Sequence, residues 1–112
     1  LKVVRAQITA ALSDLKQDGI TPVIAYEPVW AIGTGKACSA QEARLMHEAI
    51  RALLEKKWGP AGSLVRILYG GSVDQHNVGE YLSTTHIDGV LVGSASLDPR
   101  IFGLLCRAAA IA

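Results

Sequence analysis

Cysteine, aromatic residues and surplus charge are all scarce in this chain of 112 residues. The two cysteines, Cys38 and Cys106, are too few for a disulfide framework and lack the spacing of zinc ligands, so both are expected to be reduced thiols. A net charge of +1 with mixed signs gives no reason to expect a nucleic acid or a membrane as partner. No apolar run approaches the ~18 residues of a membrane span, and residues 1–5 lack a signal-peptide pattern. A soluble, cytoplasmic protein is therefore expected.

Apolar residues are abundant where those other features are scarce. They make up 50% of the sequence, and the mean hydropathy of +0.29 is high for a small soluble domain. Such values suit strands that are covered on both faces, whose sequences are continuous apolar runs. At 112 residues the chain forms one domain at most, with enough length to bury a core.

Helical spacing and short apolar runs alternate along the chain. They predict helices over residues 3–16, 39–58, 77–82 and 100–110, and strands over residues 23–26, 64–69 and 90–92. Strands that helices separate must pair in parallel through crossover connections. The pattern therefore predicts an α/β fold, either a doubly wound sheet or a (β/α)₈ barrel.

Helix starts are marked by capping residues. Ser39 and Glu42 have the spacing of a capping box, in which each side chain bonds the backbone amide of the other residue. Asp98 followed by a proline predicts the start of the closing helix. Asn77 resembles a cap for a short helix, although Gly79 weakens that helix.

The residues that follow the three predicted strands carry the functional signal. Glu27 and Pro28 end the first strand, and an apolar loop over residues 29–32 leads to a Gly-Thr-Gly tip. Such a loop suggests a lid that excludes water and whose glycine amides bind an anion. Gly-Gly-Ser at 70–72 and Gly-Ser at 93–94 follow the other strands, where backbone can approach a ligand closely.

Simpler interpretations exist for each of these residues. A glutamate before proline is often a solvated turn residue, so the case for Glu27 depends on the loop that follows it. A Gly-Gly-Ser sequence is often a tight turn. His47, His76 and His86 are interpreted as surface or packing residues rather than metal ligands, and Arg66, within an apolar strand, as a paired structural charge.

Three stretches together resemble the triosephosphate isomerase family, in the family's order. They are AYEPVWAIGTGK at 25–36, YGGSV at 69–73 and DGVLVGSASL at 88–97. The resemblance spans essentially the whole chain but less than half of such an enzyme, since a (β/α)₈ barrel takes ~250 residues. It implies the carboxy-terminal portion of a TIM barrel, with three parallel strands and four helices. Residues 1–112 would be its last three β/α units and the preceding helix.

The resemblance also implies a reaction. Glu27 matches the family's general base, which moves a proton between carbons of a phosphorylated triose and so interconverts dihydroxyacetone phosphate and glyceraldehyde 3-phosphate through an enediol. Closure of the lid over Glu27 would exclude water and keep the enediol from losing its phosphate. No cofactor and no metal are implied.

The resemblance assigns roles to further residues. Backbone amides that match the family's phosphate site are those of Gly33, Ser72, Gly93 and Ser94. The lid comprises Pro28, Val29, Trp30, Ala31, Ile32, Gly33, Thr34, Gly35 and Lys36, and its closed form would be contacted by Tyr69 and Ser72.

Two positions depart from the family's pattern. The second hinge of the lid is commonly Lys-Thr-Ala, so Ala37 lacks a hydroxyl and Cys38 adds bulk, which would alter the rate of opening. Ser94 stands where a second glycine is usual. If the backbone there needs a positive φ, serine would cost about 1 kcal/mol or more of strain.

The family's lysine after the first strand and its neutral histidine after the fourth have no counterpart in this chain. Without them nothing stabilises the developing oxyanion, so the chain alone is expected to be inactive. The expected partners are the missing amino-terminal strands and a second subunit of a homodimer. The resemblance also implies that the reaction serves glycolysis and gluconeogenesis. Two alternatives stay open: a non-catalytic phosphate-binding module, and a structural barrel fragment that exchanges strands with its own copies.

Overall fold

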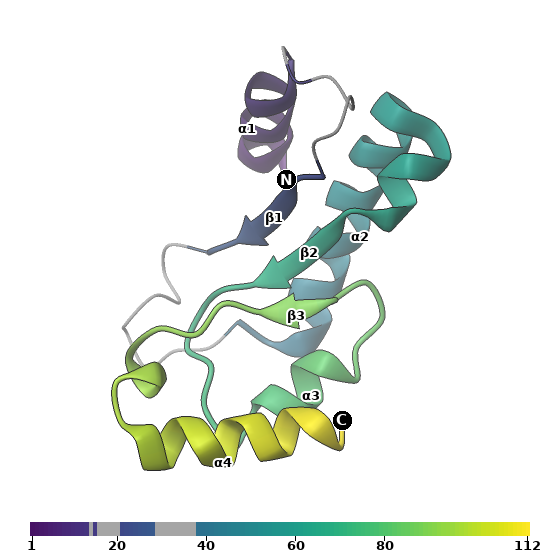
Figure 1. Cartoon of the computed structure of the whole chain (residues 1–112). Coiled ribbons are helices and arrows are strands. Elements are labelled where there is room, and N and C mark those ends of the chain that lie inside the picture. The colour runs from purple at the N-terminus through teal and green to yellow at the C-terminus, as the bar shows by residue number, and fades with distance from the viewer. Residues whose placement is uncertain (14, 16–20, 29–37) are drawn as a thin grey trace.

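The computed structural model of the 112-residue chain describes residues 1–13, 15, 21–28 and 38–112. Helices and strands alternate within these residues (Figure 1). In chain order they are α1 (Lys2–Leu12), β1 (Val23–Tyr26), α2 (Ala40–Trp58), the 3₁₀ helix η2 (Gly59–Leu64), β2 (Arg66–Tyr69), α3 (Val78–Leu82), β3 (Gly89–Val90), the 3₁₀ turn η3 (Ser94–Ser96) and α4 (Pro99–Ala110).

The three strands form one parallel sheet in the order β1-β2-β3. Tyr26 pairs with Tyr69, and Tyr69 pairs with Val90, so the carboxyl ends of all three strands lie at one edge of the sheet. The predicted α/β fold with three parallel strands and four α-helices is confirmed for the described residues, and it is consistent with part of a TIM barrel.

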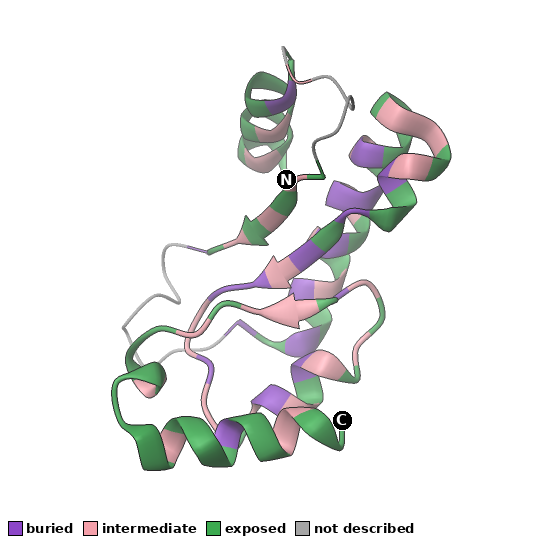
Figure 2. Ribbon diagram, in the orientation of Figure 1, coloured by how far each residue is buried: buried purple, intermediate pink, exposed green. Residues whose placement is uncertain are grey.

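The helices cover one face of the sheet, and the core lies between them. In Figure 1, α2 runs behind the strands, and Figure 2 shows the buried residues concentrated on β2 and on the side of α2 that meets it. Side chains from α1, α2 and β2 form one buried cluster: Leu12, Ile50, Leu54, Val65 and Ile67. A second cluster joins the start of α2 to β2, α3 and α4: Cys38, Ala40, Ala43, Tyr69, Val73, Val78, Tyr81, Ile87 and Leu105.

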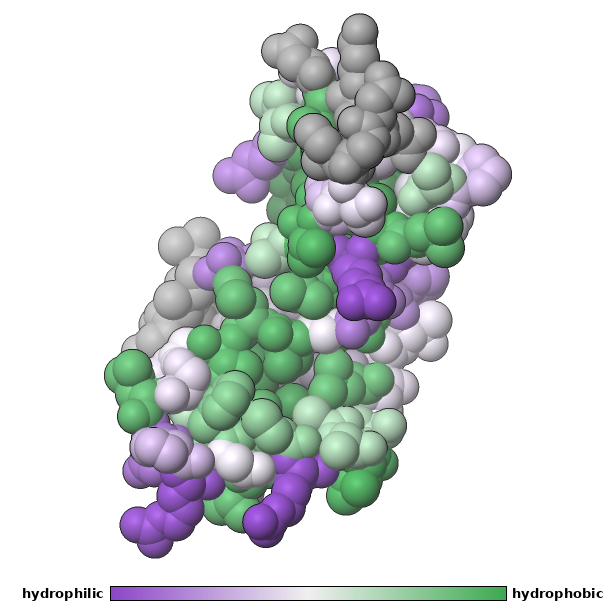
Figure 3. Space-filling model, viewed as in Figure 1, coloured by the Kyte–Doolittle hydropathy of each residue, from purple (hydrophilic) through white to green (hydrophobic). Residues whose placement is uncertain are grey.

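The opposite face of the sheet has no covering layer among the described residues. Because successive strand side chains alternate between faces, Val23 and Ala25 share this face, and both are exposed. Arg66 and Leu68 continue it on β2, and Leu91 on the segment after β3 is 45% exposed. Figure 3, which views this side, shows apolar residues gathered over the strands. We call this surface the uncovered face.

Two predicted strands have different limits in the structure. The second was expected over 64–69, but it begins at Arg66 because Gly59–Leu64 forms a 3₁₀ helix against the end of α2. A side chain at Gly62 would meet the Leu54 carbonyl oxygen at 2.3 Å, so only glycine allows this approach. The third was expected over 90–92, but only Gly89–Val90 form a strand.

The first helix is also shorter than expected. It was predicted over residues 3–16 and extends over Lys2–Leu12. Ser13 follows it as a cap, with its amide 3.5 Å from the Ala10 carbonyl oxygen. Residues 14 and 16–20 lie outside the described part of the chain.

The predicted caps of the two long helices are confirmed. The Glu42 amide donates to Ser39 Oγ at 3.1 Å, and the Ser39 amide donates to Glu42 Oε1 at 3.4 Å, which completes the capping box of α2. The Asp98 carboxylate accepts from the amides of Arg100 and Ile101, ahead of the proline that begins α4. Both helices therefore start where the sequence places them.

Asn77 does not cap α3 through its side chain. It instead accepts a bond from the Asp74 amide at 2.9 Å and donates from Nδ2 to the Ser72 carbonyl at 2.7 Å. The side chain therefore closes the turn after β2 rather than the helix that follows it.

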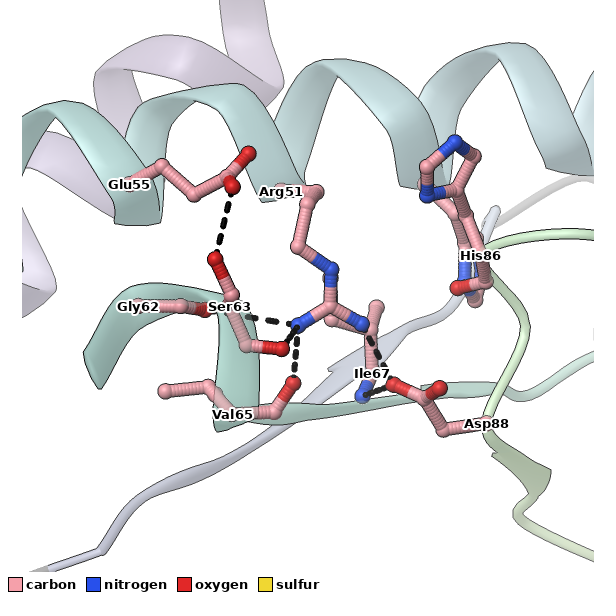
Figure 4. Close-up of polar contacts among 9 residues, drawn as sticks. Arg51, Glu55, Gly62, Ser63, Val65, Ile67, His86 and Asp88 are labelled. Carbon is pink, nitrogen blue, oxygen red and sulfur yellow. Dashed lines mark hydrogen bonds and ion pairs between the residues drawn. The ribbon is translucent and has the colours of Figure 1, made fainter. Parts of the chain in front are cut away.

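A buried arginine ties α2 to the sheet (Figure 4). Arg51 Nη2 lies 2.5 Å from Asp88 Oδ2, and the same carboxylate oxygen accepts from the Ile67 amide at 2.9 Å. Arg51 Nη1 donates to the carbonyl oxygens of Ser63, at 3.2 Å, and of Val65. These bonds join α2, the start of β2 and the residue before β3.

The paired structural charge of this region is thus Arg51. The prediction that assigned the role to Arg66 is wrong, because Arg66 is exposed and no ion pair between described residues includes it. Separately, no helix among the described residues is long and apolar enough to cross a membrane.

Candidate active site

The register of the sheet brings the ends of its strands side by side. The Gly70 amide donates to the Tyr26 carbonyl at 2.9 Å, and the Leu91 amide donates to the Tyr69 carbonyl at 2.9 Å. Both bonds continue the parallel ladder by one residue beyond the strands. Glu27, Gly70 and Leu91 therefore lie next to one another at the carboxyl edge of the sheet.

Glu27 projects across the end of β2. Glu27 stands two residues after Ala25, so both point to the uncovered face, and the Glu27 side chain is exposed. A Cβ atom at Gly70 would stand 2.8 Å from Glu27 Cγ and 3.4 Å from Cδ. Glycine at position 70 is therefore what leaves room for the carboxylate at the point where the three strand ends meet.

The residues after Glu27 are described only in part. Pro28 is buried, and Cys38, at the far end of the predicted lid, is 2% exposed. Nine residues of the predicted lid and hinge lie outside the described part of the chain: Val29, Trp30, Ala31, Ile32, Gly33, Thr34, Gly35, Lys36 and Ala37.

The turn after β2 packs against a buried tyrosine. Tyr69 is fully buried, and a side chain on Gly71 would lie 2.2 Å from its hydroxyl oxygen, so the hydroxyl rests against the Gly71 backbone. That hydroxyl has no hydrogen-bond partner among the described residues. The turn itself is held by the Val73 amide donating to the Gly71 carbonyl at 3.0 Å and by the bond from Asn77 to the Ser72 carbonyl. Asn77 is a site-supporting residue that sequence reasoning took for a helix cap.

The third predicted anion site forms a short 3₁₀ turn. Gly93 and Ser94 are exposed, and the Ser96 amide and hydroxyl both donate to the Gly93 carbonyl, at 2.9 and 2.6 Å. No hydrogen bond with a described residue engages the amides of Gly93 and Ser94. Backbone donors are thus present at this strand end as well.

Ser94 carries none of the strain considered from the sequence. Among the described residues, His86 is the one non-glycine residue with positive φ, at 73°. Gly93 itself has a φ of −89°. The cost that a positive φ would impose on serine does not arise.

An aromatic cluster lies behind the strand ends, on the covered face. The His47 ring meets the Tyr26 ring edge-on, with centroids 5.8 Å apart, and lies 6.4 Å from the Tyr69 ring. Tyr69 stacks on Tyr81 at 4.3 Å. The Tyr81 hydroxyl donates to the Cys38 carbonyl, so the cluster connects β1 to the residues just before α2.

Burial sets the protonation states in this cluster. Desolvation raises the pKa of Tyr26, Tyr69 and Tyr81, so all three hydroxyls are protonated at neutral pH. Desolvation, with a smaller contribution from the Glu42 charge, raises the pKa of Cys38 to about 11. Cys38 is therefore a neutral packing residue, and its bulk is accommodated within the second core cluster.

His47 is fully buried, and burial lowers its pKa. Its Nδ1 lies 3.2 Å from the His86 carbonyl oxygen, which can only accept, so Nδ1 carries the proton and Nε2 keeps a lone pair. Nε2 has no hydrogen-bond partner among the described residues. His47 was interpreted as a surface or packing residue, and its burial makes it a packing residue. The described residues contain no group of three or more histidine, cysteine or acidic side chains able to hold a metal.

Comparison with known proteins gives the family. The triosephosphate isomerase family matches residues 1–109. The chain is 48% identical over 108 residues to triosephosphate isomerase of Symbiobacterium thermophilum, 47% over 105 residues to that of Yarrowia lipolytica, and 48% over 110 residues to that of Pseudomonas syringae pv. syringae.

These matches cover 95%, 94% and 97% of this chain but only 42%, 42% and 44% of the relatives. The chain therefore spans less than half the length of the proteins it matches. Its three motifs, its parallel sheet and the extent of the match agree, and the chain belongs to the triosephosphate isomerase family.

Proposed function

We propose that this chain supplies the general base and most of the phosphate site of a triosephosphate isomerase, which interconverts dihydroxyacetone phosphate and glyceraldehyde 3-phosphate. The observation that carries the proposal is the position of Glu27. Its side chain crosses Gly70 at the edge where all three strand ends meet, on the face that other barrel strands would enclose. Residues at the carboxyl ends of barrel strands are the ones that perform chemistry in this fold.

In the proposed reaction the Glu27 carboxylate removes a proton from the carbon next to the substrate carbonyl. The resulting enediolate takes up a proton on the former carbonyl oxygen and becomes the enediol. Glu27 then returns its proton to the neighbouring carbon while the other hydroxyl loses its proton to become the new carbonyl, so the base is regenerated and no cofactor is needed. A carboxylate suits this task because it can approach the substrate from one side and serve both carbons. The exposure of Glu27 in this chain leaves its oxygens accessible to such a substrate.

The substrate phosphate would be held by backbone amides. We assign this role to Gly33, Ser72, Gly93 and Ser94, of which Gly33 lies outside the described residues. The exposed amides of Gly93 and Ser94 support the assignment, because they make no hydrogen bond with a described residue. Amide donors bind a phosphate dianion without introducing a positive charge that would compete for Glu27.

Residues 28–36 would close over the bound substrate and exclude water. Tyr69 and Ser72 are the proposed contacts of the closed lid. The position of the buried Tyr69 hydroxyl supports this role, since it lies against the Gly71 backbone in the turn after β2 and remains protonated.

The oxyanion that forms during proton transfer needs electrophiles that this chain does not contain. We propose that residues 1–112 are the last three β/α units of a barrel and the helix before them, and that strands from an amino-terminal part complete the site. The uncovered face and the low coverage of the relatives both support this assignment.

The test uses two proteins: this chain alone, and a joined protein in which the amino-terminal part of the Symbiobacterium thermophilum relative, the part outside the match, precedes this chain. Isomerisation of glyceraldehyde 3-phosphate is followed for both. The proposal predicts turnover by the joined protein and none above background by the chain alone. A folded joined protein without activity, or turnover by the isolated chain, would contradict it.

A further inference from the structure

A cavity of about 780 Å³ lies between α1 and α2, and no strand of the sheet contributes to its wall. Its volume is within the range of about 300–1,000 Å³ that small-molecule sites occupy. The apolar part of the wall includes Ile8 and Leu12 of α1 and Ala52 and Leu53 of α2. Leu12 is 4% exposed and belongs to the cluster that joins α1 to α2 and β2, so core packing holds this surface in place.

Three cations stand at the cavity, and its wall contains no described carboxylate. Arg5 comes from α1, and Lys56 and Lys57 come from α2, so both helices contribute positive charge. All three side chains are exposed, and no ion pair between described residues includes any of them. An apolar wall with basic side chains complements a ligand that is apolar in one part and negatively charged in another.

The carboxylates of α2 that are nearest in sequence bind other partners. Glu48 pairs with Arg44 at 2.8 Å. Glu55 accepts a hydrogen bond from the Ser63 hydroxyl at 2.7 Å, which ties it to η2. Neither carboxylate belongs to the cavity wall. The positive charge at the cavity is therefore left for an anion from outside.

The helix dipole accounts for only part of this charge. Lys56 and Lys57 lie in the last turn of α2, where the dipole favours cations. Arg5 lies near the start of α1, where the dipole disfavours a cation, and the first turn of that helix contains no acidic residue. The dipole of α1 therefore gives no reason for a cation at position 5, whereas an anion in the cavity does.

We propose that this cavity binds a long-chain carboxylate. The hydrocarbon chain would lie along Ile8, Leu12 and Leu53, and the carboxylate would be bound by the basic side chains of the wall. The inference goes beyond the proposed function and does not depend on it, because Glu27 and the residues assigned to the phosphate site do not line the cavity.

The test measures binding of dodecanoate by calorimetry, below the concentration at which it forms micelles, to the 112-residue chain and to the joined protein. Both should bind it. Octanoate should bind about 100-fold more weakly, because four fewer methylene groups are buried. Dodecyltrimethylammonium has a chain of the same length and a positive head, and it should bind about 10-fold more weakly or worse.

Variants locate the site. Replacement of Arg5, Lys56 and Lys57 together by glutamine should weaken dodecanoate binding about 10-fold or more. Ala52→Phe places a ring in the cavity and should abolish binding. Lys2→Gln is the matched control, since Lys2 is an exposed cation of α1 outside the cavity wall, and it should bind dodecanoate as the parent does. Urea unfolding of each variant checks that it is folded.

Four results would overturn the proposal. Two are equal affinity for dodecanoate and dodecyltrimethylammonium, and unchanged affinity in the triple variant. Binding to the 112-residue chain but not to the joined protein would show that the preceding segment fills the cavity. Binding that weakens as the protein concentration rises would make a second copy the occupant. Turnover is not a readout here, so an inactive joined protein that binds dodecanoate would refute the proposed function and support this inference.

Discussion

The absence of a side chain at position 70 gives Glu27 its place. The carboxylate group crosses the end of β2 within 3.4 Å of where a Cβ atom at Gly70 would stand, measured at Cδ. Sequence alone identified both residues, but it could not relate them, because they are 43 positions apart and meet only through the strand register.

Gly70→Ala is therefore expected to displace Glu27 without unfolding the protein. The new methyl group would contact Glu27 Cγ at 2.8 Å, and a shift of about 1 Å in a catalytic group reduces the rate roughly 100-fold. Steady-state kinetics of the joined protein measure the effect. Gly103→Ala is the control, because an added Cβ there meets nothing within 4 Å and should leave kcat unchanged. Equal rates for Gly70→Ala and the parent would show that Glu27 is not held by this contact.

Loss of Arg51 should cost stability, because its side chain joins α2 to β2 and to the residue before β3. Arg51→Met would leave the Val65 carbonyl without this donor and the Asp88 carboxylate with the Ile67 amide but no counter-charge, and we expect a loss of about 2 to 3 kcal/mol in the free energy of unfolding. This is below the range for fully buried pairs because the Asp88 side chain is 36% exposed.

A matched control lies on the same helix. Arg44 pairs with Glu48 at 2.8 Å on the exposed side of α2, and Arg44→Met should change the free energy by no more than about 0.5 kcal/mol. Urea unfolding of the joined protein measures both variants. Similar losses for the two substitutions would contradict the structural role of Arg51.

His47 should make stability depend on pH. Burial holds its pKa below the ordinary 6.5, so the folded protein resists a proton that the unfolded chain accepts. The contribution of neutral His47 to the free energy of unfolding is intact above pH 6.5. It is lost as the pH falls below that value, at no more than about 1.4 kcal/mol per pH unit.

Replacement of His47 should make the free energy of unfolding depend less on pH. Between pH 7.5 and pH 5.5 the joined protein is expected to lose more stability than its His47→Leu variant, as measured by urea unfolding at each pH. His76→Leu is the control, since His76 is exposed and should leave the slope unchanged. Parallel slopes for the parent and the His47 variant would exclude His47 as the source.

Among the helices and strands, the structure reproduces the starting residues that depend on local sequence alone. The capping residues of α2 and α4 act on amides within three positions, so their pattern predicts the helix starts. The start of β2 was predicted wrongly because η2 depends on packing of Gly62 against the carbonyl of Leu54, a contact with a different element.

The cap of α2 can be tested directly. Ser39→Ala removes the acceptor of the Glu42 amide, and the free energy of unfolding should fall by about 1 kcal/mol. Ser83→Ala is the comparison, because the Ser83 hydroxyl is exposed and donates only to the Gly79 carbonyl. Its loss should be clearly smaller in the same urea titration. If the two substitutions had equal effects, the capping box would not contribute to stability.

At the scale of the whole molecule, the α/β fold and the grouping of the strand ends follow from the alternation of helices and strands. The residues that sequence reasoning missed, Arg51 and Asn77, act through long-range or turn contacts that no local pattern announces. His47 was interpreted as a surface or packing residue; its burial and its pairing with the His86 carbonyl depend on the fold. Arg66 was misassigned because a charge on an uncovered face and a charge in a core look alike in one sequence.

The uncovered face brings single residues and strands together in one surface. It presents Glu27 at one end and Arg66 at the other, with apolar side chains between them. Glu27 gains its proposed role once further strands cover the face. This position of Glu27 is what supports its proposed role as the base of a site that the closed barrel completes.

That claim is tested most directly by turnover of the joined protein carrying Glu27→Gln, with phosphoglycolate binding measured by calorimetry on the same sample and Glu80→Gln, an exposed glutamate of α3, as control. The turnover rate of the Glu27→Gln protein should be about 1,000-fold lower, its phosphoglycolate affinity should stay within about threefold of the parent, and the control should keep the parental turnover. Turnover of the Glu27→Gln protein at the parental rate would contradict it.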